Sequence, residues 1–272
     1  MHFAPSPMHI PDGFLSLPLA VFLWLVSAVF IAVALRRASR DLDERALPLM
    51  GVLAAAIFAG QMLNFPVAGG TSGHLIGAAL ATILLGPWPA MLVMTSVVVV
   101  QALLFQDGGL LALGGNLFNM AVVAVLVSYA VYRLFQPLAR EKRWGVLAGG
   151  FTAAWISTVA AALACGLQLA ISGLSPANLV IPAMGGIHVL IGAGEGLITA
   201  GALAFLFAAR RDLLLAVPGS QKVDRPVWIS GLLLACALAV ASPLASTHPD
   251  GLEWVAGQQR FLQAARSPLF EL

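Results

Sequence analysis

Charged residues are scarce in this sequence, which excludes an ordinary soluble domain. Only 10% of the 272 residues are Asp, Glu, Lys or Arg, 60% are hydrophobic, and the mean hydropathy is +0.94. Soluble domains carry about 25% charged residues. Uncharged apolar runs near the ~20 residues that a membrane-spanning helix needs recur along the chain. The sequence therefore predicts an all-α fold, a polytopic transmembrane helical bundle.

Motifs of hydrolytic and nucleotide chemistry are also missing. The chain contains no HExxH, no GxSxG, no Ser-His-Asp order and no phosphate-binding loop. Its two cysteines, Cys165 and Cys236, lie inside apolar runs without a CxxC partner, and we interpret them as small packing residues. No basic tract resembles a nucleic-acid surface. We therefore predict that the chain is not an enzyme and does not bind nucleic acid.

Eight apolar segments are predicted to be membrane helices. The third is short, so its sequence alone is compatible with either crossing the membrane or dipping into it. The predicted segments are residues 15–35, 46–65, 75–85, 89–105, 117–135, 145–171, 187–208 and 227–244.

The positions of Lys and Arg decide how the third segment is placed. Twelve of the 14 basic residues fall in three clusters, at 36–45, 133–143 and 210–225. If the third segment crosses, all three clusters face the cytoplasm and only Arg260 and Arg266 lie outside, as the positive-inside rule requires. If it only dips in, the middle cluster moves outside. We therefore predict that it crosses and that the N-terminus is outside.

In this topology all five histidines fall at or near the outer face. They share that face with two asparagines spaced three residues apart, which places both on one side of a helix. Histidine is the commonest metal-binding side chain at neutral pH, so the clustering predicts an outward-facing metal site. These residues are His2, His9, His74, His188, His248, Asn116 and Asn119.

The stretch from Met8 to Phe14, MHIPDGF, offers a chelate. If the mature chain begins at Met8, its α-amine, the His9 amide nitrogen and the His9 imidazole can close a five-membered and a six-membered ring around one metal. This nitrogen set suits Ni(II) or Cu(II), and Co(II) is a further candidate. The best candidate for the fourth ligand is His74.

The start of the mature chain has two readings. Met1-His2 offers the same three nitrogens, but it lacks the Pro-Asp-Gly turn that follows His9. A retained N-terminal extension would also turn the Met8 nitrogen into an ordinary amide. We therefore predict that residues 1–7 are an extension and that the mature protein begins at Met8.

The remaining polar candidates each allow two roles. Asn116 and Asn119 are either second-shell residues of the metal site or polar contacts between helices. His188 and Glu195 lie seven residues apart on one helix face, and a carboxylate inside a membrane marks a functional site by default. A Glu195 that only locks helices together is an equal alternative.

The Met8–Leu15 motif resembles the N-terminal signature of the CbiM/NikM family, the substrate-capture components of cobalt and nickel energy-coupling-factor transporters. The similarity continues through Gly73-His74, LGGNLFNM at 113–120, His188 and GEGLIT at 194–199, and spans roughly residues 8–209. The resemblance implies a bundle of about seven helices of the S-component type. It also implies that Met8, His9 and His74 bind transported Co(II) or Ni(II), with no permanently bound cofactor.

The same resemblance implies partners and a location. A membrane coupling subunit and cytoplasmic ATPase subunits would drive import across the bacterial cytoplasmic (inner) membrane, which fits the missing phosphate-binding loop. The tail STHPDGLEW at 246–254 is similar to the PDGLE module, which stands in for a small accessory membrane subunit. Residues 210–226 are then a cytoplasmic linker and 227–272 a C-terminal module with one helix and an outer tail.

The predicted function is capture of Co(II) or Ni(II) at the outer N-terminal site for ATP-driven import by partner subunits. An alternative is a self-sufficient metal channel or proton-coupled carrier that uses the face bearing His188 and Glu195. An intramembrane metalloenzyme is a third possibility, which the missing catalytic motifs disfavour.

Overall fold

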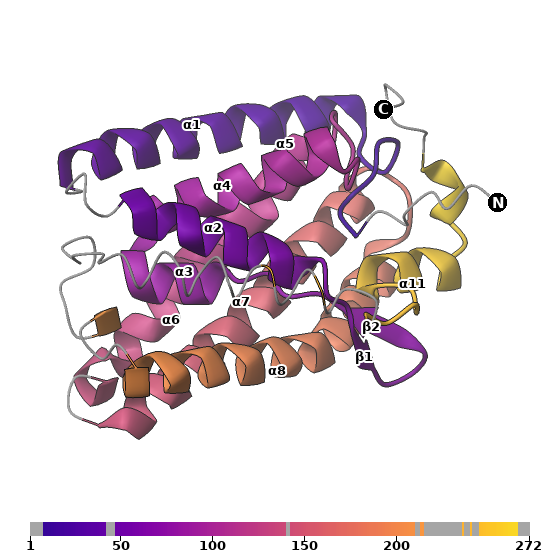
Figure 1. Ribbon diagram of the computed structural model, residues 1–272. Helices are drawn as coiled ribbons and strands as arrows, with labels where there is room; N and C mark the ends of the chain where they lie inside the picture. The colour runs from indigo at the N-terminus through magenta and orange to yellow at the C-terminus, as the bar shows by residue number, and fades with distance from the viewer. Residues whose placement is uncertain are drawn as a thin grey trace.

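The computed structural model describes residues 8–41, 47–139, 142–209, 213–214, 236, 240 and 245–265. Long helices lie side by side, and a small hairpin and the C-terminal helix sit at one end of them (Figure 1). The elements are α1 Leu17–Asp41, α2 Leu47–Gln61, β1 Phe65–Val67, β2 Thr71–Gly73, α3 Ala78–Leu85, α4 Pro87–Leu104, α5 Leu113–Leu117, η2 Phe118–Val123, α6 Ala124–Ala139, α7 Arg143–Ile171, α8 Ala177–Ala209, α11 Gly251–Gln258 and η4 Leu262–Ala264.

Five helical stretches among the described residues are long and apolar enough to cross a membrane, and they confirm the polytopic helical class. They are α1, α4, the continuous run α5–η2–α6, α7 and α8. Large apolar side chains point outward from them, as Phe22 and Leu25 of α1 do with 59% and 64% exposure. A soluble protein would bury such residues, whereas lipid accommodates them without cost.

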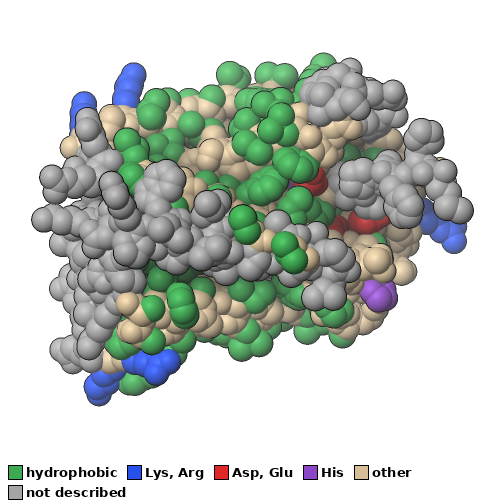
Figure 2. Space-filling model, in the orientation of Figure 1, with side chains coloured by type: hydrophobic (Ala, Val, Ile, Leu, Met, Phe, Trp, Pro, Cys, Tyr) green, Lys and Arg blue, Asp and Glu red, His purple; other side chains and the backbone are tan. Residues whose placement is uncertain are grey.

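The two ends of the bundle differ in charge. Figure 2 shows basic side chains near the end where α1 terminates, and acidic and histidine side chains toward the end that carries the hairpin and α11. Arg36, Arg37 and Arg40 belong to the C-terminal part of α1, while Arg260 follows α11 at the other end. This distribution is compatible with the positive-inside topology, which stays a prediction.

Several predicted boundaries agree with the structure and others were wrong. α4 and α7 begin and end within two residues of the predicted segments 89–105 and 145–171. α8 begins at Ala177, ten residues before the predicted 187. The helix contains Pro182 in its second turn, where the missing N–H of proline removes only one of the first backbone hydrogen bonds. The predicted segment 117–135 begins instead at Leu113. Gly114 lies in that first turn, where a Cβ would stand 2.5 Å from the Trp24 backbone nitrogen.

The second and third segments also differ from the prediction. α2 ends at Gln61, and the chain then forms the antiparallel hairpin β1–β2 instead of continuing as helix to residue 65. The third segment is helical only over α3, whose eight residues rise about 12 Å. Figure 1 shows the chain leaving β2 without helical structure and reaching α3 toward the opposite end of the bundle.

Buried side chains hydrogen-bond the non-helical backbone that precedes α3. Gln61 Nε2 donates to the Ile76 carbonyl at 2.7 Å, and the Gly77 N–H donates to Glu195 Oε1 at 2.9 Å. The hydroxyl of Thr158 donates to the other carboxylate oxygen of Glu195 at 2.5 Å. Non-helical backbone at membrane depth requires such partners. These contacts favour the helix-locking role for Glu195, whose side chain is fully buried.

Three predicted features lie outside the described residues. They are the N-terminal extension 1–7, nearly all of the linker 210–226, and the eighth span 227–244 apart from isolated positions. The C-terminal segment 245–265 is described. Its Pro-Asp-Gly sequence leads into α11, with Asp250 as the N-cap of that helix.

Replacing Glu195 with Leu should destabilise the protein. The change leaves the Gly77 N–H without its acceptor, at a cost of about 1–3 kcal/mol, and lowers the thermal unfolding midpoint in detergent. Glu195→Gln keeps an acceptor for Gly77 and should stay close to wild type. Thr199→Val is the matched control, because the buried Thr199 hydroxyl has no hydrogen-bond partner among the described residues. Equal midpoints for E195L and T199V would contradict this role.

Candidate metal centre

Residues 8–12 lie along the loop that joins α4 to α5. The Gly109 N–H donates to the Ile10 carbonyl at 2.9 Å. One oxygen of the Asp12 carboxylate accepts the N–H groups of Leu111 and Ala112 at 2.9 and 3.0 Å. Ile10 and Asp12 therefore fix the N-terminal segment to this loop.

Asn116 holds the residue that follows His9. Its side-chain oxygen accepts the Ile10 N–H at 3.0 Å and its Nδ2 donates to the Ile10 carbonyl at 3.1 Å, so one amide satisfies both backbone groups. Gly108 makes this approach possible. A Cβ there would lie 2.9 Å from both Asn116 Nδ2 and His9 Cβ, at a φ of +94°.

Three nitrogens of Met8 and His9 converge on Asp107. The backbone nitrogens of Met8 and His9 donate to Asp107 Oδ1 at 2.7 and 3.1 Å. The Nδ1 atom of the His9 ring lies 3.1 Å from Asp107 Oδ2 as an ion pair. These are the same three atoms that the sequence predicts as a chelate. Asp107 was not among the residues that the sequence predicted for the site. Its carboxylate places an anion between the three nitrogens.

The pairing changes the proton affinity of both side chains. Burial lowers the pKa of His9, but the charge and hydrogen bonding of Asp107 outweigh it, so the His9 pKa is raised above its ordinary value of 6.5. Burial raises the pKa of Asp107, but the facing His9 outweighs this and the pKa is lowered. Both shifts favour a protonated His9 beside an ionised Asp107, so the pairing strengthens the competition of a proton with a metal ion for His9 Nδ1.

His74 lies next to His9. The two rings meet edge to face with their centroids 5.4 Å apart, and His74 Nδ1 lies 3.6 Å from Asp250 Oδ2. The structure thus brings together Met8, His9 and His74, the three predicted ligand residues. Among the described residues, no three His, Cys, Asp or Glu side chains form a conventional metal site.

The other predicted residues make their hydrogen bonds outside this cluster. Asn119 exchanges two hydrogen bonds with Gln168 of α7, at 3.0 and 2.7 Å, and so joins two helices. His188 Nδ1 pairs with the Met184 carbonyl of its own helix at 2.8 Å. Glu195 contacts the backbone before α3, as described above.

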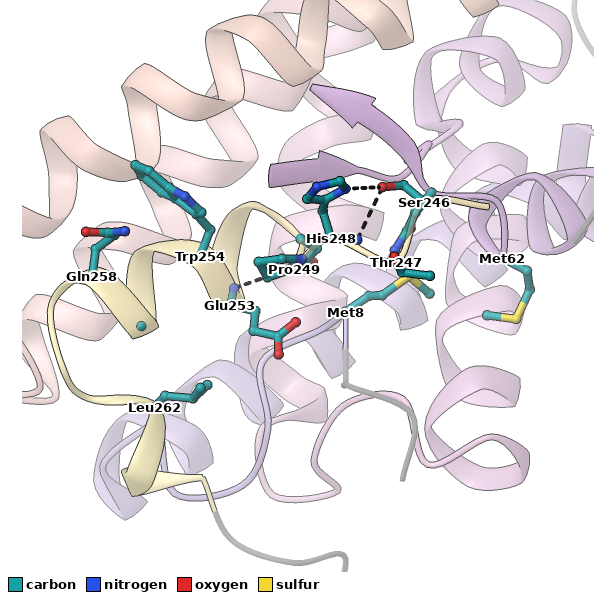
Figure 3. Close-up of a pocket in the computed structure, with 13 residues that line it drawn as sticks. Met8, Met62, Ser246, Thr247, His248, Pro249, Glu253, Trp254, Gln258 and Leu262 are labelled. Carbon is teal, nitrogen blue, oxygen red and sulfur yellow. Dashed lines mark hydrogen bonds between the residues drawn. The ribbon is translucent and has the colours of Figure 1, made fainter. Parts of the chain in front are cut away.

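A cavity of about 660 Å³ lies beside the N-terminal segment (Figure 3). Met8 is in its wall, together with residues that follow α2 and with the C-terminal segment. The chemistry of the wall is mixed, since thioether, imidazole, carboxylate and indole groups all contribute. Its lining includes Met62, Asn64, His248, Glu253 and Trp254.

Comparison with known proteins identifies the family. Residues 9–213 match the model of CbiM, described as the cobalt uptake substrate-specific transmembrane region. This chain belongs to the CbiM family.

Relatives and a solved structure agree with this membership. A protein of Haloquadratum walsbyi, provisionally named a metal transport protein, is 46% identical over 207 residues, covering 76% of this chain and 93% of the relative. The fused nickel transport protein NikMN of Rhodobacter capsulatus is 34% identical over 252 residues, covering 86% and 72%. The crystal structure of a truncated transition metal transporter has a TM-score of 0.66 and 35% identity, covering 74% of this chain and 99% of that one.

Asn116 and Asn119 should differ in their effect on metal binding by this CbiM-family chain. Asn116→Ala removes both contacts to Ile10, and we expect Ni(II) affinity to fall by about 10–100-fold, as for other outer-shell partners. Asn119→Ala breaks the pair with Gln168 and should lower the unfolding midpoint with little change in affinity. Titration of both purified variants checks this, and equal affinity losses would contradict it.

Metal affinity should fall on acidification, beginning above pH 6.5. The raised pKa of His9 means that protons compete with the metal at a higher pH than for an ordinary histidine. Asp107→Asn removes the partner that raises this pKa, so the loss of affinity should move to lower pH. Ni(II) titrations between pH 5 and 8 measure both curves. An identical pH midpoint in the two proteins would refute the link.

Proposed function

We propose that this chain is the substrate-specific membrane component of an energy-coupling-factor importer for Co(II) or Ni(II). It captures the metal outside the membrane with the Met8 amine, the His9 amide and imidazole nitrogens, and His74. The observation that carries this proposal is the convergence of the three Met8 and His9 nitrogens on one point, beside the ring of His74.

Metal capture requires the loss of protons from the chelate. The amine, the amide and His9 Nδ1 must each present a lone pair, so none of them donates to Asp107 any longer. A divalent metal on one deprotonated amide carries a net charge of +1, and the Asp107 carboxylate balances that charge nearby. Asp107 thus keeps the three nitrogens together before binding and neutralises the complex afterwards.

The amine exists only if the mature chain begins at Met8. The proposed organisation is an extension 1–7, a metal-capture domain 8–209, a linker 210–226 and a C-terminal module 227–272. The N-terminus lies outside the bacterial cytoplasmic membrane. The polar side chains at the hairpin end of the bundle and the arginines of α1 at the other support this orientation (Figure 2).

Partner subunits supply the energy in this proposal. A membrane coupling subunit and cytoplasmic ATPases move the loaded component, and the PDGLE-like module takes the place of an accessory subunit. The carrier alternative needs a proton path through His188 and Glu195. The contacts of Glu195 with Gly77 and Thr158, and of His188 with Met184, disfavour that path.

His74→Ala tests the proposal directly. Loss of a ligand should weaken Ni(II) or Co(II) binding by more than the about 10–100-fold that loss of an outer-shell partner costs, while the protein still inserts and unfolds cooperatively. ATP-driven uptake into vesicles that contain the partner subunits should fall in parallel. Trp254→Phe, a change in the wall of the adjoining cavity, is the control.

Two outcomes would contradict the proposal. One is wild-type affinity in the His74→Ala protein. The other is concentrative uptake by the chain alone under a proton gradient, which would favour the carrier alternative.

A further inference from the structure

The C-terminal segment 245–265 is joined to the hairpin two residues before His74. The Ser72 N–H donates to the Pro249 carbonyl at 2.8 Å, and the Ser72 hydroxyl donates to the His248 carbonyl at 2.8 Å. Ser72 and Asp250 also form a parallel β-bridge. Main-chain pairing thus fixes the C-terminal segment next to the metal centre, although more than 170 residues separate the two in sequence.

Apolar packing holds the same segment against α8. Leu252, Val255 and Ala256 of α11 are buried in one hydrophobic cluster with Ile191. At Gly251, a Cβ would lie 2.7 Å from Ile191 Cδ1 and 2.8 Å from His188 Cε1. This close approach allows no larger residue without movement, so it sets the position of the preceding Asp250.

The two oxygens of the Asp250 carboxylate have different partners. Oδ1 accepts the Glu253 N–H at 2.9 Å and so caps the N-terminus of α11. Oδ2 lies 3.6 Å from His74 Nδ1, and the Asp250 residue is only 4% exposed. The cap therefore orients the carboxylate toward Nδ1 of His74, which leaves Nε2 as the nitrogen that can bind a metal.

We infer that Asp250 is a positioning residue for His74, and that the C-terminal segment is thereby part of the metal site. This inference rests on the proposed function, in which His74 is a ligand. A carboxylate on the far nitrogen of a ligand histidine fixes the ring orientation and makes the ligand more basic. The ligand class is a divalent metal in a nitrogen square, as Ni(II) and Cu(II) prefer.

The alternative is that Asp250 only caps α11. One substitution distinguishes this role from the positioning of His74. Serine caps helices about as well as aspartate, but its short side chain carries no carboxylate to face His74. We therefore compare full-length Asp250→Ser, His74→Ala and the double variant, all with the same N-terminus. The probes are Ni(II) and Cu(II) alone, and the readouts are the dissociation constant, the visible spectrum of the bound metal and the thermal unfolding midpoint.

We expect D250S to bind Ni(II) about 10–100-fold more weakly, with shifted visible bands and an unfolding midpoint near wild type. Because Asp250 acts through His74, D250S should cause no further loss in the His74→Ala background, so the two effects are not additive. Asp250→Asn, which also caps, is the second variant if the serine protein does not fold. It should likewise lose affinity.

Glu253→Gln is the matched control, since it removes a carboxylate from the same cavity wall three residues away. We expect its affinity within about twofold of wild type. Wild-type affinity in D250S, an additive loss in the double variant, or an equal loss in E253Q would each overturn the inference. If His74→Ala itself binds normally, the proposed function fails. If only D250S binds normally, the proposed function stands and this inference fails.

Discussion

The candidate metal centre depends on the hydrogen bonding between residues 8–12 and the loop before α5. A short N-terminal segment has high conformational entropy, and fixing each residue costs roughly 1–2 kcal/mol. Asp107, Asn116 and Asp12 offset that cost with a series of buried contacts to the chain itself. Because most of these contacts reach backbone atoms, they place the Met8 and His9 nitrogens without blocking the side chain of His74.

A second constraint lies deeper, where the chain leaves β2 and reaches α3 without helical structure. The membrane provides no water for that backbone, so Gln61 and Glu195 provide its hydrogen bonds. These hydrogen bonds fix the position of β2, which ends just before His74, along the axis of the bundle. The candidate metal centre therefore depends on a polar contact inside the bundle, and Glu195 has a structural reason to be there.

The sequence predicted the parts of the molecule that local pattern determines. Apolar run length indicated the helical class and the approximate bounds of most helices. The chelate stays a prediction, whose three nitrogens the structure brings together at Asp107. The sequence did not predict Asp107 or Asp250, because each acts through a contact across 98 residues or more along the chain. An acidic residue in the loop 106–109, on the predicted outer face, was the available signal for Asp107. The sequence did not predict the first ten residues of α8, because a proline such as Pro182 commonly marks the boundary of a helix.

The central claim is that backbone nitrogen of Met8 and His9 binds the metal. X-ray absorption at the nickel edge, on the Ni(II)-loaded native protein whose N-terminus has been read by intact mass, tests it most directly. The account predicts a mature chain that begins at Met8 and a square-planar site of four nitrogens. A mature chain that begins at Met1, or a six-coordinate site rich in oxygen, would contradict it.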